Sequence, residues 1–302
     1  MTVEKAIFER HIRPLTPVPT GVVPRLEGMQ NLRAILFDVY GTLLISGSGD
    51  IGVTRKQSAK VDDLQDLLQR YHIDRTPDGL SAALHQSIEE EHAEARRRGI
   101  DFPEVDIIRV WQTVLGFGDA SRLKLFALEY ELMVNPVYPM PGLNTLLSTC
   151  RARRMPMGII SNAQFFTPFL LERFLGSSLE KSGFDYRLIF LSYRFGYAKP
   201  SMFMFKRAAD ELSRTGIPVE AALYVGNDTL NDIRPASAVG FKTALFAGDG
   251  RSLRPRESDD RCRGLSPDLI VTDLRQLIAG TVNPSPRSRH GQISRRPAHI
   301  RR

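Results

Sequence analysis

The 302-residue sequence contains little cysteine, a single tryptophan and no long apolar run. Its two cysteines, Cys150 and Cys262, are too few for a disulfide framework and lack the spacing of metal ligands, which favours a reducing cytoplasm. The apolar runs are far shorter than the roughly 18–20 residues that a membrane-spanning helix requires. The first residues contain no apolar stretch typical of a secretory signal. We therefore expect a folded cytoplasmic protein without a membrane span.

Positive charge exceeds negative charge, with 41 basic and 34 acidic residues giving a net charge of +7. Nearly all of this excess lies in residues 281–302, which contain six arginines and no acidic residue. A segment rich in serine, proline and arginine has little apolar surface to bury, so we expect a disordered basic tail. Such a tail contacts polyanions without sequence specificity, and we predict no other nucleic-acid partner.

Regular structure is expected from Arg33 onward, where short apolar runs alternate with amphipathic segments typical of helices. The runs predicted to form strands are 33–38, 157–161, 187–192, 221–226, 242–246 and 268–271. Continuous apolar strands that alternate with helices indicate a parallel sheet covered on both faces. The sequence therefore predicts an α/β fold with a doubly wound, Rossmann-like parallel sheet.

Residues 51–135 interrupt this alternation, because they show several stretches of helical period and no convincing strand. We interpret them as a helical cap domain inserted after the first strand, at the edge where doubly wound sheets bind ligands. The other predicted boundaries are an extended lead-in over residues 1–30, which hold four prolines, a core over 31–50 and 136–280, and the basic tail over 281–302.

Asp38 directly follows the first predicted strand and is followed by Gly41 and Thr42. A carboxylate at the end of a buried parallel strand projects into the ligand crevice, and the glycine lets the backbone turn away. In that place an aspartate serves as a nucleophile, as a metal ligand or merely as a cap for the next turn. This motif alone is weak evidence of function.

Three later segments complete a pattern with this first one. The four segments are Asp38-Val39-Tyr40-Gly41-Thr42, Ser161-Asn162, Lys199-Pro200, and Gly226-Asn227-Asp228-Thr229-Leu230-Asn231-Asp232. Their order and spacing resemble the four motifs of the haloacid dehalogenase superfamily, which lie at the carboxyl ends of successive strands. The resemblance covers about residues 33–280, and the helical insert is similar to the type-one cap of that superfamily.

The resemblance implies a role for each motif residue. Asp38 would attack an electrophile and form a covalent aspartyl intermediate that water hydrolyses, with Tyr40 and Lys199 as the other catalytic residues. Lys199 would place an ammonium beside Asp38 and neutralise charge as it builds. The residues expected to bind an anionic group of a small-molecule substrate are Thr42, Ser161, Asn162 and Lys199. The simpler alternatives are an N-cap for Ser161 or Asn162 and an exposed lysine at 199.

The fourth motif points to a metal site. Asp228 and Asp232, four residues apart after a strand that ends in glycine, offer the oxygen ligands that a hard cation prefers. The resemblance implies that Asp38, the main-chain carbonyl of Tyr40, Asp228 and Asp232 bind Mg²⁺. Alternatively, Asp228 begins the following helix and Asp232 lies in its first turn, a role that does not exclude the metal. Asn227 stands where many phosphatases of the superfamily carry the first acid of this motif.

Tyr40 departs from the phosphatases of the superfamily, which usually carry an aspartate there as general acid. A tyrosine, with an ordinary pKa near 10, is poorly matched to proton transfer near neutral pH. The 2-haloacid dehalogenases do carry tyrosine at this position, because a halide leaves without a proton. They also use an arginine for the substrate, for which Arg55, Arg70 and Arg75 are candidates. The fourth motif of this sequence argues the other way, because the dehalogenases need no metal and typically carry serine and asparagine in place of Asp228 and Asp232.

We therefore expect an enzyme, a hydrolase with an aspartate nucleophile. The favoured activity is that of a Mg²⁺-dependent phosphatase acting on a small phosphorylated metabolite, such as an acyl or aryl phosphate. The alternative is a metal-independent 2-haloacid dehalogenase, which Tyr40 suggests. A second alternative is a weakly active or non-catalytic protein that binds a ligand through the same fold. Dependence of turnover on Mg²⁺ separates the first two.

Overall fold

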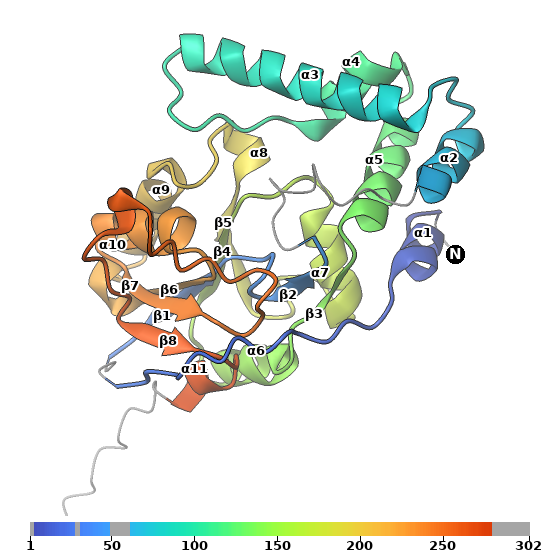
Figure 1. The fold of residues 1–302 in the computed structure, drawn as a ribbon. Helices are drawn as coiled ribbons and strands as arrows, with labels where there is room; N and C mark the ends of the chain where they lie inside the picture. Colours follow the sequence, from blue (N-terminus) through green and yellow to red (C-terminus); the bar gives the residue numbers. More distant parts are fainter. Residues whose placement is uncertain (1–2, 28–30, 49–60, 280–302) are drawn as a thin grey trace, which may run out of the picture.

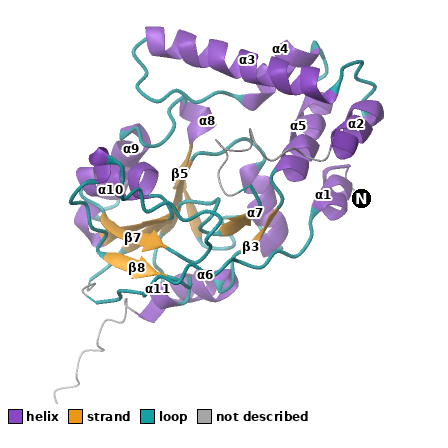
Figure 2. Cartoon of the chain, viewed as in Figure 1, coloured by secondary structure: helices purple, strands orange, loops and turns teal. Residues whose placement is uncertain are grey.

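The computed structural model describes residues 3–27, 31–48 and 61–279, and the predicted basic tail at 281–302 lies outside them. Figures 1 and 2 show a sheet with helices on both faces, and a second group of helices beyond one edge of that sheet. No helix in the described ranges is long and apolar enough to cross a membrane.

Six parallel strands form the main sheet, in the order β5-β4-β1-β6-β7-β8. Their bounds are β1 Ala34–Phe37, β4 Met157–Ser161, β5 Phe184–Leu191, β6 Ala222–Gly226, β7 Lys242–Phe246 and β8 Leu269–Val271. Each strand overlaps one of the six predicted runs, so the predicted α/β class is confirmed. Because β1 lies in the interior of the sheet, the residue that follows it, Asp38, lies near the middle of the carboxyl edge.

The sheet is buried on both faces, as β1 illustrates. Ile35 and Phe37 belong to one core, and Ala34 and Leu36 belong to the other. The first core is covered by α6 (Leu143–Ala152), α7 (Thr167–Leu175) and α11 (Gln276–Ala279), and the second by α9 (Phe203–Arg214) and α10 (Arg234–Val239). Shorter segments are α8 (Ser192–Phe195), η1 (Val219–Ala221), η2 (Thr229–Ile233) and η3 (Asp260–Cys262). Burial on both sides explains why the strands are apolar throughout.

The helical insert leaves the core through β2 (Leu44–Ser46) and returns through β3 (Val137–Pro139), which pair in antiparallel fashion. Its helices are α2 (Val61–Arg70), α3 (Pro77–Arg97), α4 (Ile107–Leu115) and α5 (Ala120–Val134). They share a separate core in which the rings of Trp111 and Phe126 meet edge to face, 4.9 Å apart. Asp106 and Asp119 cap α4 and α5 through side-chain oxygens that accept main-chain N–H groups. The predicted insertion of helices into the α/β core is confirmed.

The expectation of an extended lead-in over residues 1–30 is wrong at its beginning, where α1 (Val3–His11) is a helix. Ile7 and Phe8 on this helix are buried, and the ring of Phe8 meets that of Phe174 edge to face at 5.0 Å. The four prolines of the lead-in all follow α1, so they do not oppose the helix. The helix forms because tertiary packing stabilises nine residues that would be marginal alone.

Glu129 of α5 joins the cap to α1. Its Oε1 atom lies 2.6 Å from Arg10 Nη1, 3.0 Å from His11 Nε2 and 3.0 Å from Arg70 Nη2, and its side chain is only 2% exposed. Burial alone would raise the pKa of Glu129, but the hydrogen bonds with His11 and Arg10 and the charge of Arg70 lower it to about 2. The ionised carboxylate therefore holds α1, α2 and α5 together.

Replacing Glu129 with glutamine is expected to lower the free energy of unfolding by about 2 kcal/mol at pH 7, because it removes the charge that pairs with Arg10 and Arg70 and is hydrogen-bonded to His11. A carboxyl with a lowered pKa stabilises the fold above its ordinary value and loses this contribution as pH falls toward 2. Urea unfolding at several pH values measures the loss. Glu94→Gln, in an exposed pair with Arg97, is the control and should change nothing measurable. Equal effects of the two substitutions would contradict the assignment.

Candidate active site

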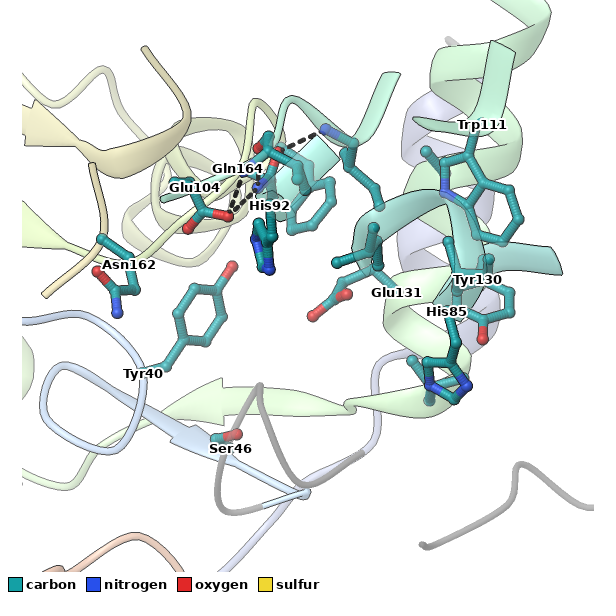
Figure 3. A pocket seen from close by; sticks show the side chains of 18 of the residues that line it. Tyr40, Ser46, His85, His92, Glu104, Trp111, Tyr130, Glu131, Asn162 and Gln164 are labelled. Atoms are coloured by element: carbon teal, nitrogen blue, oxygen red, sulfur yellow. Dashed lines mark hydrogen bonds between the residues drawn. The ribbon is translucent and has the colours of Figure 1, made fainter. Parts of the chain in front are cut away.

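A cavity of about 800 Å³ lies between the carboxyl edge of the sheet and the cap. Its core side is lined by the motif residues Asp38, Asn162, Lys199, Asp228 and Asp232. The cap side is lined mostly by apolar and aromatic side chains, with several carboxyl and imidazole groups among them (Figure 3). Doubly wound sheets bind ligands at this edge, so the position marks the candidate site.

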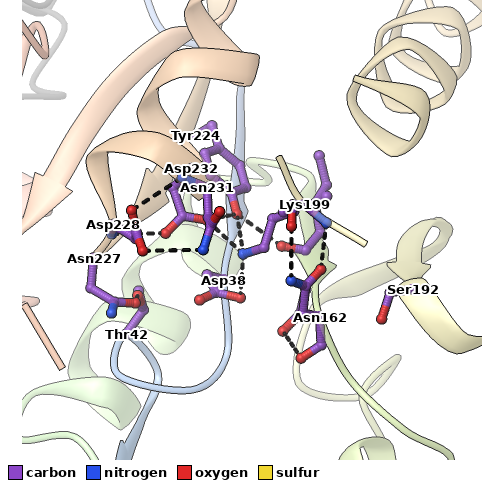
Figure 4. A network of polar contacts seen from close by, with 12 residues as sticks. Asp38, Thr42, Asn162, Ser192, Lys199, Tyr224, Asn227, Asp228, Asn231 and Asp232 are labelled. Carbon is purple, nitrogen blue, oxygen red and sulfur yellow. Dashed lines mark hydrogen bonds and ion pairs between the residues drawn. The ribbon is translucent and has the colours of Figure 1, made fainter. Parts of the chain in front are cut away.

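Lys199 is the centre of the polar network on the core side (Figure 4). Its ammonium Nζ lies 2.8 Å from Asp38 Oδ1 and 2.5 Å from Asp232 Oδ1, and the lysine side chain is 3% exposed. The Tyr224 hydroxyl is 2.9 Å from the same Asp232 oxygen and 2.8 Å from the carbonyl oxygen of Ile160. An unpaired lysine at this depth would be costly, so its two carboxylate partners fix its place. The alternative of an exposed lysine at position 199 is wrong.

The charges around Lys199 do not balance completely. Burial raises the pKa of Asp232 to about 6; Lys199 opposes this shift, and the nearby charges of Asp38 and Asp228 add to it. Burial opposes the charge on Lys199, but Asp232 and Asp38 together raise the lysine pKa above its ordinary value. One ammonium is therefore shared by two carboxylates, with a third carboxylate close enough to repel them.

Side chains of the fourth motif, residues 226–232, form hydrogen bonds with the main chain of the same segment. Asp228 caps η2 by accepting hydrogen bonds from the main-chain N–H groups of Leu230 and Asn231, so the predicted helix-starting role of Asp228 is confirmed. The same carboxylate pairs with Arg256, whose Nη2 lies 2.6 Å from Asp228 Oδ2. Gly226 is required here, because a Cβ atom at that position would lie 2.3 Å from Cγ of Asp232.

The residues predicted to contact the substrate occupy different places. Asn162 lines the cavity, and its Oδ1 accepts a 2.7 Å hydrogen bond from the main-chain N–H of Lys199. Ser161 is fully buried, and its hydroxyl donates to the carbonyl oxygen of Asn162 at 3.4 Å. Thr42 is also buried and donates to Oδ1 of Asn227 at 3.2 Å. The substrate-binding roles of these three residues stay predictions.

Tyr40 lines the cavity, but its hydroxyl lies 2.9 Å from Oγ1 of Thr167, to which it is hydrogen-bonded. Burial and the charge of Glu131 raise the pKa of the Tyr40 phenol far above its ordinary value of 10, despite the bond to Thr167. The phenol is therefore neutral at every working pH. A group this weakly acidic is poorly suited to protonate a leaving group.

The predicted Mg²⁺ ligands are only partly arranged as expected. In the described residues, no group of three or more aspartate, glutamate, histidine or cysteine side chains is placed to hold a metal ion. Both oxygens of Asp232 are already bonded, Oδ1 to Lys199 and Tyr224 and Oδ2 to the main-chain N–H of Asp228. Asp232 is therefore placed as a partner of Lys199, and its role as a metal ligand stays a prediction.

The remaining predicted donors fit Mg²⁺ in kind. Asp38 and Asp228 both line the cavity, and with the main-chain carbonyl of Tyr40 they would offer only oxygen atoms. The negative charge that raises the pKa of Asp232 also favours a cation there. An ion would share the Asp228 carboxylate with Arg256.

The sequence reasoning missed the cap side of the cavity. His85 and His92 on α3, Glu104 before α4 and Glu131 on α5 all line it. The helical period predicted the cap helices without showing which face meets the sheet. The sequence of α5 did contain one signal for Glu131. The residues of this helix that line the cavity are Ala127, Tyr130, Glu131 and Val134. Glu131 is the single carboxyl group on this otherwise apolar or aromatic face.

The arginines considered for a substrate carboxylate do not meet in this cavity. Arg70 pairs with Glu129, and Arg75 donates to the carbonyl oxygen of Val114 at 2.9 Å. Neither lines the cavity. Arg55 lies outside the described residues.

The class of this protein follows from comparison with known proteins. A family model described as haloacid dehalogenase-like hydrolase matches residues 32–240. The phosphoglycolate phosphatase of Pseudomonas putida is 28% identical over 276 residues, which cover 88% of this chain and 82% of the relative. The phosphoglycolate phosphatase of Pseudomonas fluorescens is 26% identical over 260 residues, covering 83% and 80%.

A solved structure of 2-haloacid dehalogenase from Pseudomonas syringae pv. Tomato shares the fold, with a TM-score of 0.54 and 19% sequence identity over 82% of this chain and 97% of that one. The relatives matched by sequence and by structure carry different activities, so the comparisons leave the reaction open within the family. The chain belongs to the haloacid dehalogenase-like hydrolases, and the resemblance carried by its four motifs is confirmed.

Replacing Lys199 with methionine is expected to lower the free energy of unfolding by about 3 kcal/mol at pH 8, because two carboxylates lose their shared cation. The loss should shrink at pH 5. The pKa of Asp232 is already raised in the folded protein, so protonation as pH falls favours the fold and removes the unpaired charge. Urea unfolding of Lys199→Met and of the double variant with Asp232→Asn measures this. A loss that is independent of pH and unchanged in the double variant would contradict the shared pairing.

Proposed function

We propose that this hydrolase is a Mg²⁺-dependent phosphatase that acts on a small phosphorylated molecule, with Asp38 as the nucleophile. The observation that carries the proposal is the Asp38 carboxylate, 2.8 Å from Lys199 Nζ on the core side of the cavity. The two phosphoglycolate phosphatases among its relatives support phosphate as the group transferred. The acidic groups beside Asp38 support a bound cation, because Lys199 and Arg256 offer two positive charges to the three carboxylates of Asp38, Asp228 and Asp232.

The proposed reaction has two steps. A carboxylate oxygen of Asp38 attacks phosphorus while the bond between phosphorus and the leaving oxygen breaks, which gives an aspartyl phosphate. Water then attacks phosphorus, releases inorganic phosphate and restores Asp38. Throughout, the Lys199 ammonium stays beside Asp38 and offsets the charge of the phosphoryl oxygens. Thr42, Ser161 and Asn162 are the predicted contacts for those oxygens.

The metal would be held by Asp38, Asp228 and the main-chain carbonyl of Tyr40. When bound, Mg²⁺ neutralises phosphoryl oxygens and orients them for in-line attack. Asp232 would hold the ammonium of Lys199 beside Asp38 through its 2.5 Å contact with Nζ. The prediction of a cytoplasmic, small-molecule hydrolase belongs to the same proposal.

The second candidate is a metal-independent 2-haloacid dehalogenase. Tyr40 favours it, because a halide departs without the proton that a buried, weakly acidic phenol fails to supply. The apolar cap wall also suits a small organic halide. A non-catalytic ligand-binding protein is the least supported alternative, since the Asp38–Lys199 pair lies open to a cavity large enough for a substrate.

Phosphate release from acetyl phosphate, p-nitrophenyl phosphate and phosphoglycolate is expected with Mg²⁺ and not with EDTA. Asp38→Asn should reduce kcat by roughly 10³-fold or more, because the amide is not a nucleophile. Asp78→Asn, another cavity-lining acid on the cap side, is the matched control and should stay within a few-fold of the wild type. Halide release from 2-chloropropionate without metal, together with no phosphate release, would replace the phosphatase by the dehalogenase.

Mg²⁺ is expected to raise the melting temperature of the wild type by several degrees. A ligand that binds only the folded protein, at a concentration about 100 times its Kd, stabilises the fold by roughly 2.7 kcal/mol. The Mg²⁺-dependent increment should fall sharply in Asp228→Asn and persist in Asp260→Asn, whose carboxyl is exposed. Comparing each variant with and without Mg²⁺ removes any effect of the substitution on stability itself. An equal increment in all three proteins would place the ion elsewhere.

A further inference from the structure

Glu131 differs from the other glutamate of the cavity, because only one of its two carboxylate oxygens has a hydrogen-bond partner among the described residues. It lies on α5 of the cap, is half-buried, and points into the same space as Tyr40 in Figure 3. Its Oε1 accepts a 3.1 Å hydrogen bond from Nδ2 of Asn135. Among the described residues, no hydrogen-bond or ion-pair partner reaches its other oxygen. That oxygen is free to meet a ligand in the cavity.

Glu104, the other glutamate of the cavity, is bonded on both oxygens. Its Oε2 accepts a 2.7 Å hydrogen bond from Ser192, and its Oε1 accepts one of 2.9 Å from the main-chain N–H of Val105. Gln164 adds a contact of 3.4 Å to Oε1. Both oxygens of Glu104 are therefore engaged in hydrogen bonds within the protein, whereas Glu131 is held through one oxygen by Asn135.

The proposed phosphatase needs a proton donor that the core does not supply. An ester oxygen leaves as an alkoxide unless a proton reaches it, and an acid in the right place accelerates this step by about 10²–10⁴-fold. Tyr40 occupies the expected position, but its phenol is bonded to Thr167 and is far too weakly acidic. The donor must therefore come from another wall of the cavity.

We propose that Glu131 is the general acid–base residue of this hydrolase, supplying from the cap the proton that Tyr40 does not. The proposal rests on the proposed phosphatase function. As Asp38 forms its bond to phosphorus, the phosphorus–oxygen bond breaks, its electron pair goes to the leaving oxygen, and that oxygen takes the proton of Glu131. In the second step the ionised Glu131 takes a proton from water, and the water oxygen forms a bond to phosphorus. The bond between phosphorus and the Asp38 oxygen breaks, and its electron pair returns to the Asp38 carboxylate. Inorganic phosphate leaves, Asp38 is again ionised and Glu131 is again protonated.

The surroundings of Glu131 are consistent with this role. Burial raises the pKa of its carboxyl to about 7, although the hydrogen bond from Asn135 opposes the shift. Both protonation states are then populated near neutral pH, as an acid–base residue requires. Titratable or charged groups share the cavity with Glu131 on both sides. From the core they are Asp38, Tyr40, Lys199, Asp228, Asp232 and Arg254, and from the cap Asp78, His85, His92, Glu104 and Tyr130. Since two histidines line the same cavity, a substitution must identify the group.

The test compares Glu131→Gln with Glu104→Gln across a series of phosphate esters. The leaving groups range from p-nitrophenol, which departs without a proton, to a simple alkyl alcohol, which does not. For Glu131→Gln we expect kcat/KM to fall by less than about 5-fold with p-nitrophenyl phosphate and by at least about 100-fold with the alkyl ester. The basic limb of the pH profile with the alkyl ester should also disappear. Glu104→Gln should affect all esters equally and keep that limb.

Two further measurements separate the possible failures. Glu131→Asp retains a carboxyl group and should restore part of the activity toward alkyl esters, which a purely structural role in packing α5 would not produce. An equal loss for every ester in Glu131→Gln would overturn the acid–base role while leaving the phosphatase intact. If the wild type releases no phosphate even from acetyl phosphate, which needs no acid, the proposed function itself fails and this role fails with it.

Discussion

The ammonium of Lys199 is the group on which the core side of the site depends. It is buried, and it contacts Asp38 at 2.8 Å and Asp232 at 2.5 Å. Without it, two carboxylates would share a low-dielectric space with no cation between them. The short contacts also fix Asp38 at the end of β1 and tie it to the fourth motif after β6. In the proposed function, stability and reactivity therefore depend on the same ion pair.

The cap encloses the cavity and also contributes titratable side chains to its lining. Glu129 and Glu131 lie two residues apart on α5, yet their surroundings differ. Glu129 contacts two arginines and a histidine, and Glu131 faces the cavity. The pKa of the first falls to about 2, and that of the second rises to about 7. One helix thus carries a permanent anion that anchors α1 and a titratable carboxyl that faces the substrate space. This division gives the cap a direct part in the proposed reaction.

The sequence predicted the sheet and the insert well, because continuous apolar runs and helical periods are local signals. It also predicted that Asp38, Lys199 and Asp228 lie together, and all three line the same cavity. Asp38 and Asp228 closely follow β1 and β6, and the carboxyl ends of parallel strands meet at one edge of the sheet. It did not predict α1, whose helix depends on contacts with α5 and α7 far along the chain. The pairing of Asp232 with Lys199 and the exposure of Glu131 to the cavity depend on side-chain direction, which periodicity does not carry.

In the proposed reaction, the phosphoryl group is bonded covalently to Asp38 during turnover. Borohydride reduces an aspartyl phosphate to homoserine, so the wild type should be mixed with acetyl phosphate and Mg²⁺, quenched during turnover, reduced and digested. The peptide that contains residue 38 is then examined by mass spectrometry. We predict homoserine at position 38 only when substrate was present. An unmodified Asp38, or reduction at another carboxyl group, would contradict the account.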